Sequence, residues 1–142
     1  IEAMSIKGFK TKFQLYTVPG QVHYNATRKL VLKGADAVVF VADSMRVRHE
    51  QNIESLKDMA QNLKDYGLNI FHFPVVMQYN KRDLADAGVP LMSIEEMNRF
   101  YNRQLKAPFF GASATTGMGV NDTLKASLVQ TLRSLKKQAG WE

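Results

Sequence analysis

Residues 73–83 read FPVVMQYNKRD, and this stretch decides the fold of the chain. Its first half is a compact apolar run, which is typical of a strand that is buried on both faces of a parallel sheet. Pro74 cannot donate a backbone hydrogen bond and therefore suits the beginning of a strand. The second half, residues 80–83, follows this strand directly. Because open α/β sheets bind ligands at the carboxyl ends of their strands, we expect a ligand site there.

The tetrapeptide NKRD at residues 80–83 matches the pattern N-K-x-D, which suits recognition of guanine. Guanine presents two adjacent donors, N1–H and the 2-amino group, and the carboxylate of Asp83 can accept both. Adenine presents a lone pair at N1, so the same carboxylate repels it. Asn80 is predicted to tie neighbouring loops together and to reach the base edge. The stem of Lys81 is predicted to cover the ring, with its ammonium group in water. The alternative is a charged loop without a ligand, because a short motif match alone is only suggestive.

Segments typical of strands and of helices alternate along the rest of the chain, which favours an α/β fold with a mainly parallel sheet and helices on both faces. The apolar run at residues 37–42 predicts a second strand that is buried on both faces. Apolar spacing over residues 50–66 predicts an amphipathic helix that Gly67 ends. The other expected elements are two strands within 1–16 with a turn near Gly8, a helix over 24–33, a helix from a capping box at Ser93 to Leu105, a strand at 109–110, and a last helix from an Asn121 cap to Gly140.

Composition and charge narrow the class of protein. The length of 142 residues fits one domain, and 45% hydrophobic with 23% charged residues is ordinary for a globular chain. The absence of cysteine excludes disulfides and thiolate metal sites. No apolar run approaches the roughly 20 residues that span a bilayer, so we expect no transmembrane segment. The formal charge of +6 favours a solvated basic surface, with an acidic partner or a membrane surface as the alternative. Aromatic residues do not interleave with the basic ones, so nucleic-acid binding is not expected.

Residues 111–114 (GASA) extend the predicted site. They follow the next expected strand and have the form of a loop that offers a backbone N–H to guanine O6. Ser113 and Ala114 are the candidate binding residues, and Ala114 supplies the N–H. Small residues in a turn are common, so the prediction depends on the position of this loop one helix-and-strand unit after the NKRD tetrapeptide. Asp43 and Ser44 end the strand at 37–42 and are predicted to cap a loop rather than to form a catalytic pair.

Residues 17–21 (TVPGQ) close a strand-like run and have the form of the loop that faces the γ-phosphate in small GTPases. In such loops the glycine N–H meets the γ-phosphate and the glutamine orients the attacking water. Gly20 is therefore predicted to bind nucleotide, and Gln21 is the predicted catalytic residue. The alternative is a Pro-Gly turn at the end of a strand. The predicted switch region comprises Thr17, Val18, Pro19, Gly20 and Gln21.

Residues 13–30, 34–44 and 78–84 together resemble the MglA-type bacterial small Ras-like GTPases of gliding motility and cell polarity. Thr17, where other small GTPases have aspartate, is part of that resemblance. The likeness implies a Ras-like P-loop NTPase domain that switches between GTP- and GDP-bound states, with Mg²⁺ as a cofactor. It also implies a Roadblock-type GTPase-activating partner of the MglB kind, effectors of polarity or motility, and a cytoplasmic location at a cell pole.

The 142 residues contain no phosphate-loop pattern G-x-x-x-x-G-K-[ST]. Relative to the family, the first strand, the phosphate loop, the first helix and the first switch are absent from this chain. The sheet is therefore expected to have a gap between a strand ending at Tyr16 and the strand at 37–42. Three explanations stay open: a segment of the whole protein that precedes Ile1, a fragment that rearranges, or a natural remnant. The alternative function is a nucleotide-independent GTPase-like scaffold or a fragment that binds no nucleotide.

Overall fold

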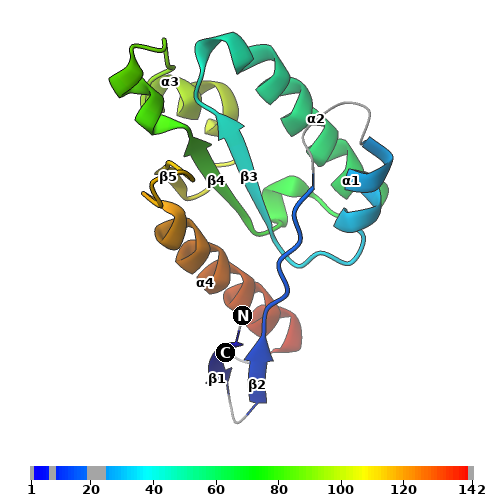
Figure 1. Ribbon diagram of the computed structural model, residues 1–142. Coiled ribbons are helices and arrows are strands. Elements are labelled where there is room, and N and C mark those ends of the chain that lie inside the picture. The colour runs from blue at the N-terminus through cyan, green and yellow to red at the C-terminus, as the bar shows by residue number, and fades with distance from the viewer. Residues whose placement is uncertain (1, 7–8, 19–24, 141–142) are drawn as a thin grey trace.

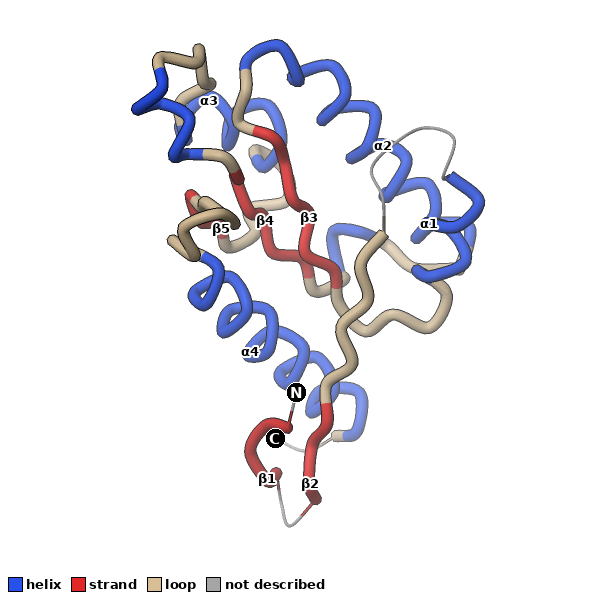
Figure 2. The backbone as a smooth tube through the Cα atoms, in the orientation of Figure 1, coloured by secondary structure: helices blue, strands red, loops and turns tan. Residues whose placement is uncertain are grey.

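The computed structural model describes residues 2–6, 9–18 and 25–140. Its centre is a parallel sheet with the strand order β3-β4-β5 (Figures 1 and 2). The strands of this sheet are β3 (Val38–Asp43), β4 (Val75–Asn80) and β5 (Phe109–Gly111). The α-helices are α1 (Asn25–Leu32), α2 (His49–Asp65), α3 (Ile94–Met97) and α4 (Val120–Ala139). This parallel sheet with its helices confirms the predicted α/β fold.

Strand β4 is the middle strand, and residues 75–79 are all buried. Its register pairs Met77 with Phe40 of β3 on one side and with Phe109 of β5 on the other. Because side chains alternate along a strand, β4 supplies two different faces to the core. The continuous apolar run in the sequence is thereby explained for this strand.

Helices cover both faces of the sheet. One face packs against α2, and the core there includes Met59 and Leu63 of α2 together with Phe40, Met77 and Tyr79 of the sheet. On the other face, the side-chain Nε2 of Gln78 donates to Thr123 Oγ1 of α4 at 2.9 Å. The two helices therefore hold β4 from opposite sides, as the sequence pattern predicts.

The prediction that both faces of the strand at 37–42 are buried is wrong for one face of β3. Val39 and Val41 are 38% and 53% exposed, whereas Phe40 and Ala42 on the α2 side are buried. The reason is positional, since β3 is an edge strand of the described sheet and α4 packs mainly over β4. The apolar run alone does not distinguish a covered strand from one whose outer face is open.

The N-terminal part forms an antiparallel hairpin of β1 (Glu2–Ile6) and β2 (Phe9–Lys12). The strand that was predicted to reach Tyr16 ends at Lys12, whose pairing partner is Glu2, so the prediction is wrong for residues 13–16. A strand needs a neighbour for its backbone groups, and Leu15 and Tyr16 are instead 64% and 71% exposed. Among the described residues no strand pairing joins the hairpin to the β3-β4-β5 sheet, so the two are separate sheets.

Two predicted helix boundaries need correction. The helix that starts at the Ser93 capping box is α-helical only to Met97 and continues as a π-helical turn over residues 98–102. Asn98 and Asn102 interrupt the regular pattern, because their amides bond to each other and Asn102 also brackets Ala107. The last helix is capped by Gly119 in the left-handed conformation rather than by Asn121, while Gly140 ends it as predicted.

Helix α2 ends as predicted before Gly67, which adopts φ +76°. Helix α1, inside the helix predicted at 24–33, packs against α2, and Arg28 forms an ion pair with Asp58 of α2 at 3.0 Å. Among the described residues, no helix combines the length and the apolarity that crossing a bilayer requires.

The capping box at the start of α3 predicts a pH dependence of stability. The backbone N–H of Ser93 and the guanidinium of Arg46 hold the pKa of Glu96 below its ordinary value. A lowered folded-state pKa adds stability above the unfolded-state pKa, and this stability is lost as the pH falls through the folded-state pKa. We therefore expect Glu96→Gln to lower the unfolding free energy at neutral pH and to flatten its decline below about pH 4.5, the ordinary value.

Urea unfolding across a pH series measures this effect. Glu95→Gln is the matched control, because Glu95 is exposed and its carboxylate is outside the capping box. If the unfolding free energies of the two variants decline identically at acidic pH, the prediction is wrong.

Candidate functional site

The carboxyl ends of the three parallel strands meet at one edge of the sheet, where Asp43, Asn80 and Gly111 are the last strand residues (Figure 2). The backbone joins the loops that follow them. Ser44 N–H donates to Asn80 O at 3.1 Å, and Arg82 N–H donates to Ala112 O at 3.0 Å. The predicted binding residues of the NKRD and GASA segments therefore lie in adjacent loops at this edge.

Asn80 links these two loops through its side chain. Its Oδ1 accepts the backbone N–H of Ala114 at 2.9 Å. That N–H is the predicted donor to guanine O6, and in this structure it has an internal partner. A base that takes the N–H must share it with Asn80 or displace the Asn80 amide.

Lys81 adopts the left-handed conformation, with φ +69°, at the end of β4. Its Nζ forms an ion pair with Asp43 Oδ2 at 2.8 Å, and the Lys81 side chain is 44% exposed. The ammonium group is therefore held over the end of β3 rather than left in water alone. Asp43 Oδ1 also accepts the N–H of Met45 at 2.9 Å, so Asp43 caps its loop as predicted.

Asp83 lies half-buried in the 3₁₀ segment Arg82–Ala87. Its carboxylate has no hydrogen bond or ion pair with any other residue that the structure describes. The neighbouring guanidinium of Arg82 donates instead to Met92 O at 2.6 Å, and burial lowers the pKa of Arg82. Asp83 therefore keeps both oxygens available as acceptors at the strand edge.

Ser113 is 1% exposed and shapes the loop after β5. Its N–H donates to Met118 O at 2.9 Å, and its Oγ accepts the N–H of Thr116 at 3.3 Å. These bonds curl residues 113–118 back on themselves and leave Ala114 exposed. The role of Ser113 in this structure is thus to position the backbone of Ala114.

Gly119, for which no role was predicted from the sequence, packs against the backbone that leads into this loop. It adopts φ +73°, and a Cβ there would overlap Gly111 O and lie 3.1 Å from Ala112 Cα. The start of α4 therefore packs directly on the backbone that leads into Ser113 and Ala114. The G-M-G spacing at 117–119 was the available signal, because closely spaced glycines suggest left-handed backbone.

The predicted switch region is described only in part. Thr17 and Val18 are exposed and lie outside any strand. Pro19, Gly20 and Gln21 fall outside the described residues, so their predicted roles remain predictions. The structure brings together Asn80, Lys81, Asp83, Ser113 and Ala114.

Two further side chains belong to this edge, although no binding role was predicted for them. Asp43 holds Lys81, as described above. Ser44 is fully buried, and its Oγ has no hydrogen-bond partner among the described residues. Within the same residues, no three His, Cys, Asp or Glu side chains gather into a possible metal site.

A family model, described as the Ras family, matches residues 1–133, and the chain therefore belongs to the Ras family. The chain is similar to the mutual gliding-motility protein MglA of Myxococcus xanthus, with 52% identity over 132 residues. That match covers 93% of this chain and 65% of the relative. The chain is also 25% identical over 122 residues to a putative Ras-related protein Rab-5B of Dictyostelium discoideum, which covers 86% of this chain and 53% of the relative. The chain thus spans between half and two thirds of the length of these curated relatives.

Proposed function

We propose that the whole protein is a guanine-nucleotide-dependent switch that hydrolyses GTP to GDP. The observation that supports this proposal is the Asp83 carboxylate, which has no hydrogen-bond or ion-pair partner among the described residues and lies at the carboxyl edge of a Ras-family sheet. A guanine base supplies the two donors that such a carboxylate lacks. Asn80, Lys81 and the Ser113–Ala114 loop surround the same edge and complete the base-binding half of the site.

The phosphate half of the site requires residues other than those described. Mg²⁺ neutralises phosphate charge in enzymes of this class, and the described residues offer no cluster of ligands for it. We propose that the whole protein binds Mg²⁺ together with the nucleotide phosphates. In this chain Gly20 would sense the γ-phosphate, and Gln21 would orient the attacking water.

The biological role that we propose follows from similarity to a protein named for mutual gliding motility. We propose that the switch controls cell polarity and gliding motility from the cytoplasm at a cell pole, through effectors and a Roadblock-type activating protein of the MglB kind. A pull-down of that activating protein with GTP-loaded and GDP-loaded protein tests the partner. Equal recovery in both states would contradict the switch and would support the scaffold alternative.

The decisive experiment is to denature the purified full-length protein and to assay released nucleotide by chromatography. Release of near-stoichiometric GDP or GTP is the expected result. If no nucleotide is released, and none is taken up when GTP and Mg²⁺ are added, the switch proposal is wrong and the nucleotide-independent scaffold replaces it.

Gln21→Leu is expected to slow GTP hydrolysis at least about tenfold while GDP affinity changes by less than about twofold. The reason is that a leucine cannot hold the attacking water, whereas the glutamine is not expected to contact GDP. Phosphate release under single-turnover conditions measures the effect. Gln14→Leu is the matched control, because Gln14 is an exposed residue outside the predicted switch. Normal turnover in the Gln21 variant would remove Gln21 from the mechanism.

A further inference from the structure

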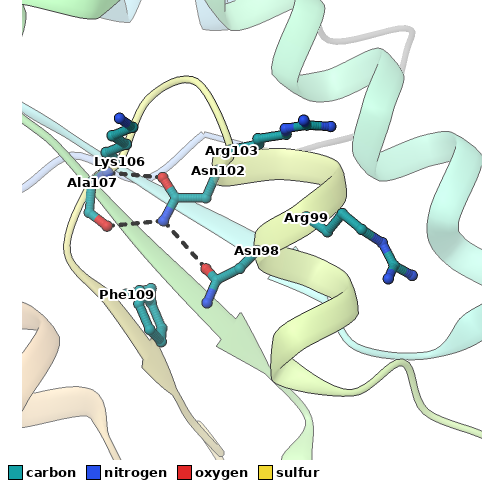
Figure 3. Close-up of a pocket in the computed structure, with 7 residues that line it drawn as sticks. All are labelled: Asn98, Arg99, Asn102, Arg103, Lys106, Ala107 and Phe109. Atoms are coloured by element: carbon teal, nitrogen blue, oxygen red, sulfur yellow. Dashed lines mark hydrogen bonds between the residues drawn. The ribbon is translucent and has the colours of Figure 1, made fainter.

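Two adjoining hollows lie toward the amino ends of the strands, whereas the predicted nucleotide site lies at their carboxyl ends. The first has a volume of about 690 Å³ and the second about 370 Å³, and they share Lys106 and Ala107 (Figure 3). We call them together the basal groove. Ala107 precedes β5 and Pro74 precedes β4, so the groove runs along the amino ends of the strands. The C-terminal half of α4 forms its far wall through residues 130–137.

The lining of the basal groove is strongly basic. It contains five lysine or arginine side chains and one histidine, and it contains no aspartate or glutamate. Among the described residues, none of these five cations has an ion-pair partner, because the described salt bridges use other lysines and arginines. The six side chains are Arg99, Arg103, Lys106, Arg133, Lys137 and His72. The chain contains aspartate and glutamate residues elsewhere, so its overall composition does not account for a groove lining that is uniformly basic.

The first hollow also holds oriented hydrogen-bond donors. Asn98 Oδ1 accepts from Tyr79 Oη at 2.6 Å and from Asn102 Nδ2 at 3.2 Å. These two bonds orient the Asn98 amide, and its N–H groups donate to no other described residue. Figure 3 shows Asn98 on the side of the helical segment that faces Phe109, with Arg99 and Arg103 projecting from the other side. The hollow therefore has amide donors on its Phe109 side, and the Arg99 and Arg103 cations lie on the outer side of the helical segment that bounds it.

The backbone around this hollow is irregular. Residues 98–102 form a π-helical turn, a conformation that is frequent at functional sites. Lys106 adopts φ +50°, which is uncommon for a residue with a side chain. The Asn102 amide stabilises this arrangement by bonding to both backbone groups of Ala107.

Exposed aromatic rings complete the groove. Phe71 is 55% exposed in the second hollow, and Phe109 is 45% exposed in the first. Aromatic residues next to arginines are typical of the parts of interfaces that carry binding energy. Together with the charge, they indicate a partner that carries both acidic and apolar side chains.

We propose that the basal groove binds an acidic segment of another protein, in which aspartate or glutamate side chains alternate with apolar ones. The carboxylates pair with the five cations and with the Asn98 amide, and the apolar side chains pack on Phe71 and Phe109. A peptide fits better than a bilayer, because the surface is concave and its amide donors have fixed directions. The groove and the predicted nucleotide site lie at opposite edges of the sheet, so both can be occupied at once.

A labelled peptide of repeating Glu-Leu-Asp is the probe, and fluorescence anisotropy at several salt concentrations is the measurement. We expect saturable binding that weakens as salt rises, and no binding of the same peptide with Gln and Asn in place of the acids. The double variant Arg99→Glu/Arg103→Glu is expected to bind the probe at least about tenfold more weakly. Lys125→Glu reverses one charge, half the change of the double variant, on an exposed part of α4 outside the groove, and its affinity should stay within about twofold.

Circular dichroism and thermal unfolding establish whether the variants fold. If the double charge-reversal variant does not fold, Arg103→Gln is a milder substitution that tests the same surface. Equal loss of affinity for Lys125→Glu would reduce the effect to general charge and overturn the proposal. Absence of saturable peptide binding would overturn it as well. Binding of phosphatidylglycerol vesicles without binding of the peptide would also overturn the proposal, because the surface would then be a membrane contact. Asp83→Asn should bind the peptide as the unchanged protein does, so failure of the nucleotide proposal leaves this test interpretable.

Discussion

Replacement of Asp83 by asparagine is expected to lower the affinity of the full-length protein for GTP at least about a hundredfold and to shift its preference to xanthosine triphosphate. The carboxylate at position 83 is half-buried and has no partner within residues 2–6, 9–18 and 25–140, so its two acceptors can receive the N1–H and 2-amino donors of guanine. An asparagine places one donor at that edge, which opposes a guanine donor but matches the additional oxygen of xanthine.

Competition binding with GTP, GDP and their xanthosine counterparts measures this exchange of specificity. Asp86→Asn is the matched control, because Asp86 is an exposed carboxylate in the same 3₁₀ segment. Its nucleotide preference should not change. If Asp83→Asn retains the preference for guanine, the carboxylate does not read the base and the site assignment is wrong.

Replacement of Gly119 by alanine is expected to lower the free energy of unfolding by about 2–5 kcal/mol, the sum of left-handed backbone strain and overpacking. Gly119 has φ +73°, and a Cβ there would overlap Gly111 O. The obstacle is backbone rather than the end of a flexible side chain, so relief requires the start of α4 to move away from β5. Because the same contact supports the Ser113–Ala114 loop, guanine-nucleotide affinity should fall as well.

Urea unfolding of both proteins measures the loss of stability. Gly117→Ala is the matched control in the same loop, because Gly117 has φ +86° but a Cβ there meets nothing within 4 Å. That variant carries the backbone strain alone and should lose about 1–2 kcal/mol. Equal losses for the two variants would show that the close approach to Gly111 is not what Gly119 provides.

Local signals in the sequence were sufficient for several parts of the fold. The Ser93 capping box depends on bonds within one turn, and both its hydrogen bonds are present. Gly67 and Gly140 end their helices because left-handed backbone is a local preference. Strand β4 was predicted from its apolar run, and the structure buries residues 75–79.

Features that depend on distant neighbours were predicted less well. The apolar run of β3 predicts two buried faces, but Val41 is 53% exposed because α4 does not cover it. Residues 13–16 have a strand-like pattern, yet none of the described strands pairs with them. Asn121 is a good capping residue, but the approach of α4 to Gly111 places the left-handed Gly119 at the cap instead.

The sequence by itself determined which residues form the candidate base-binding site, because Asn80, Asp83 and Ala114 each follow a strand that its own apolar residues define. Tertiary structure alone decided how these residues are engaged. Asn80 accepts the Ala114 N–H and Lys81 pairs with Asp43, whereas Asp83 pairs with no residue in the part of the chain that the structure describes. The physical reason is that the apolar runs and the motifs that follow them are local patterns in the chain, whereas these contacts arise only when parallel strands bring segments more than 30 residues apart to one edge.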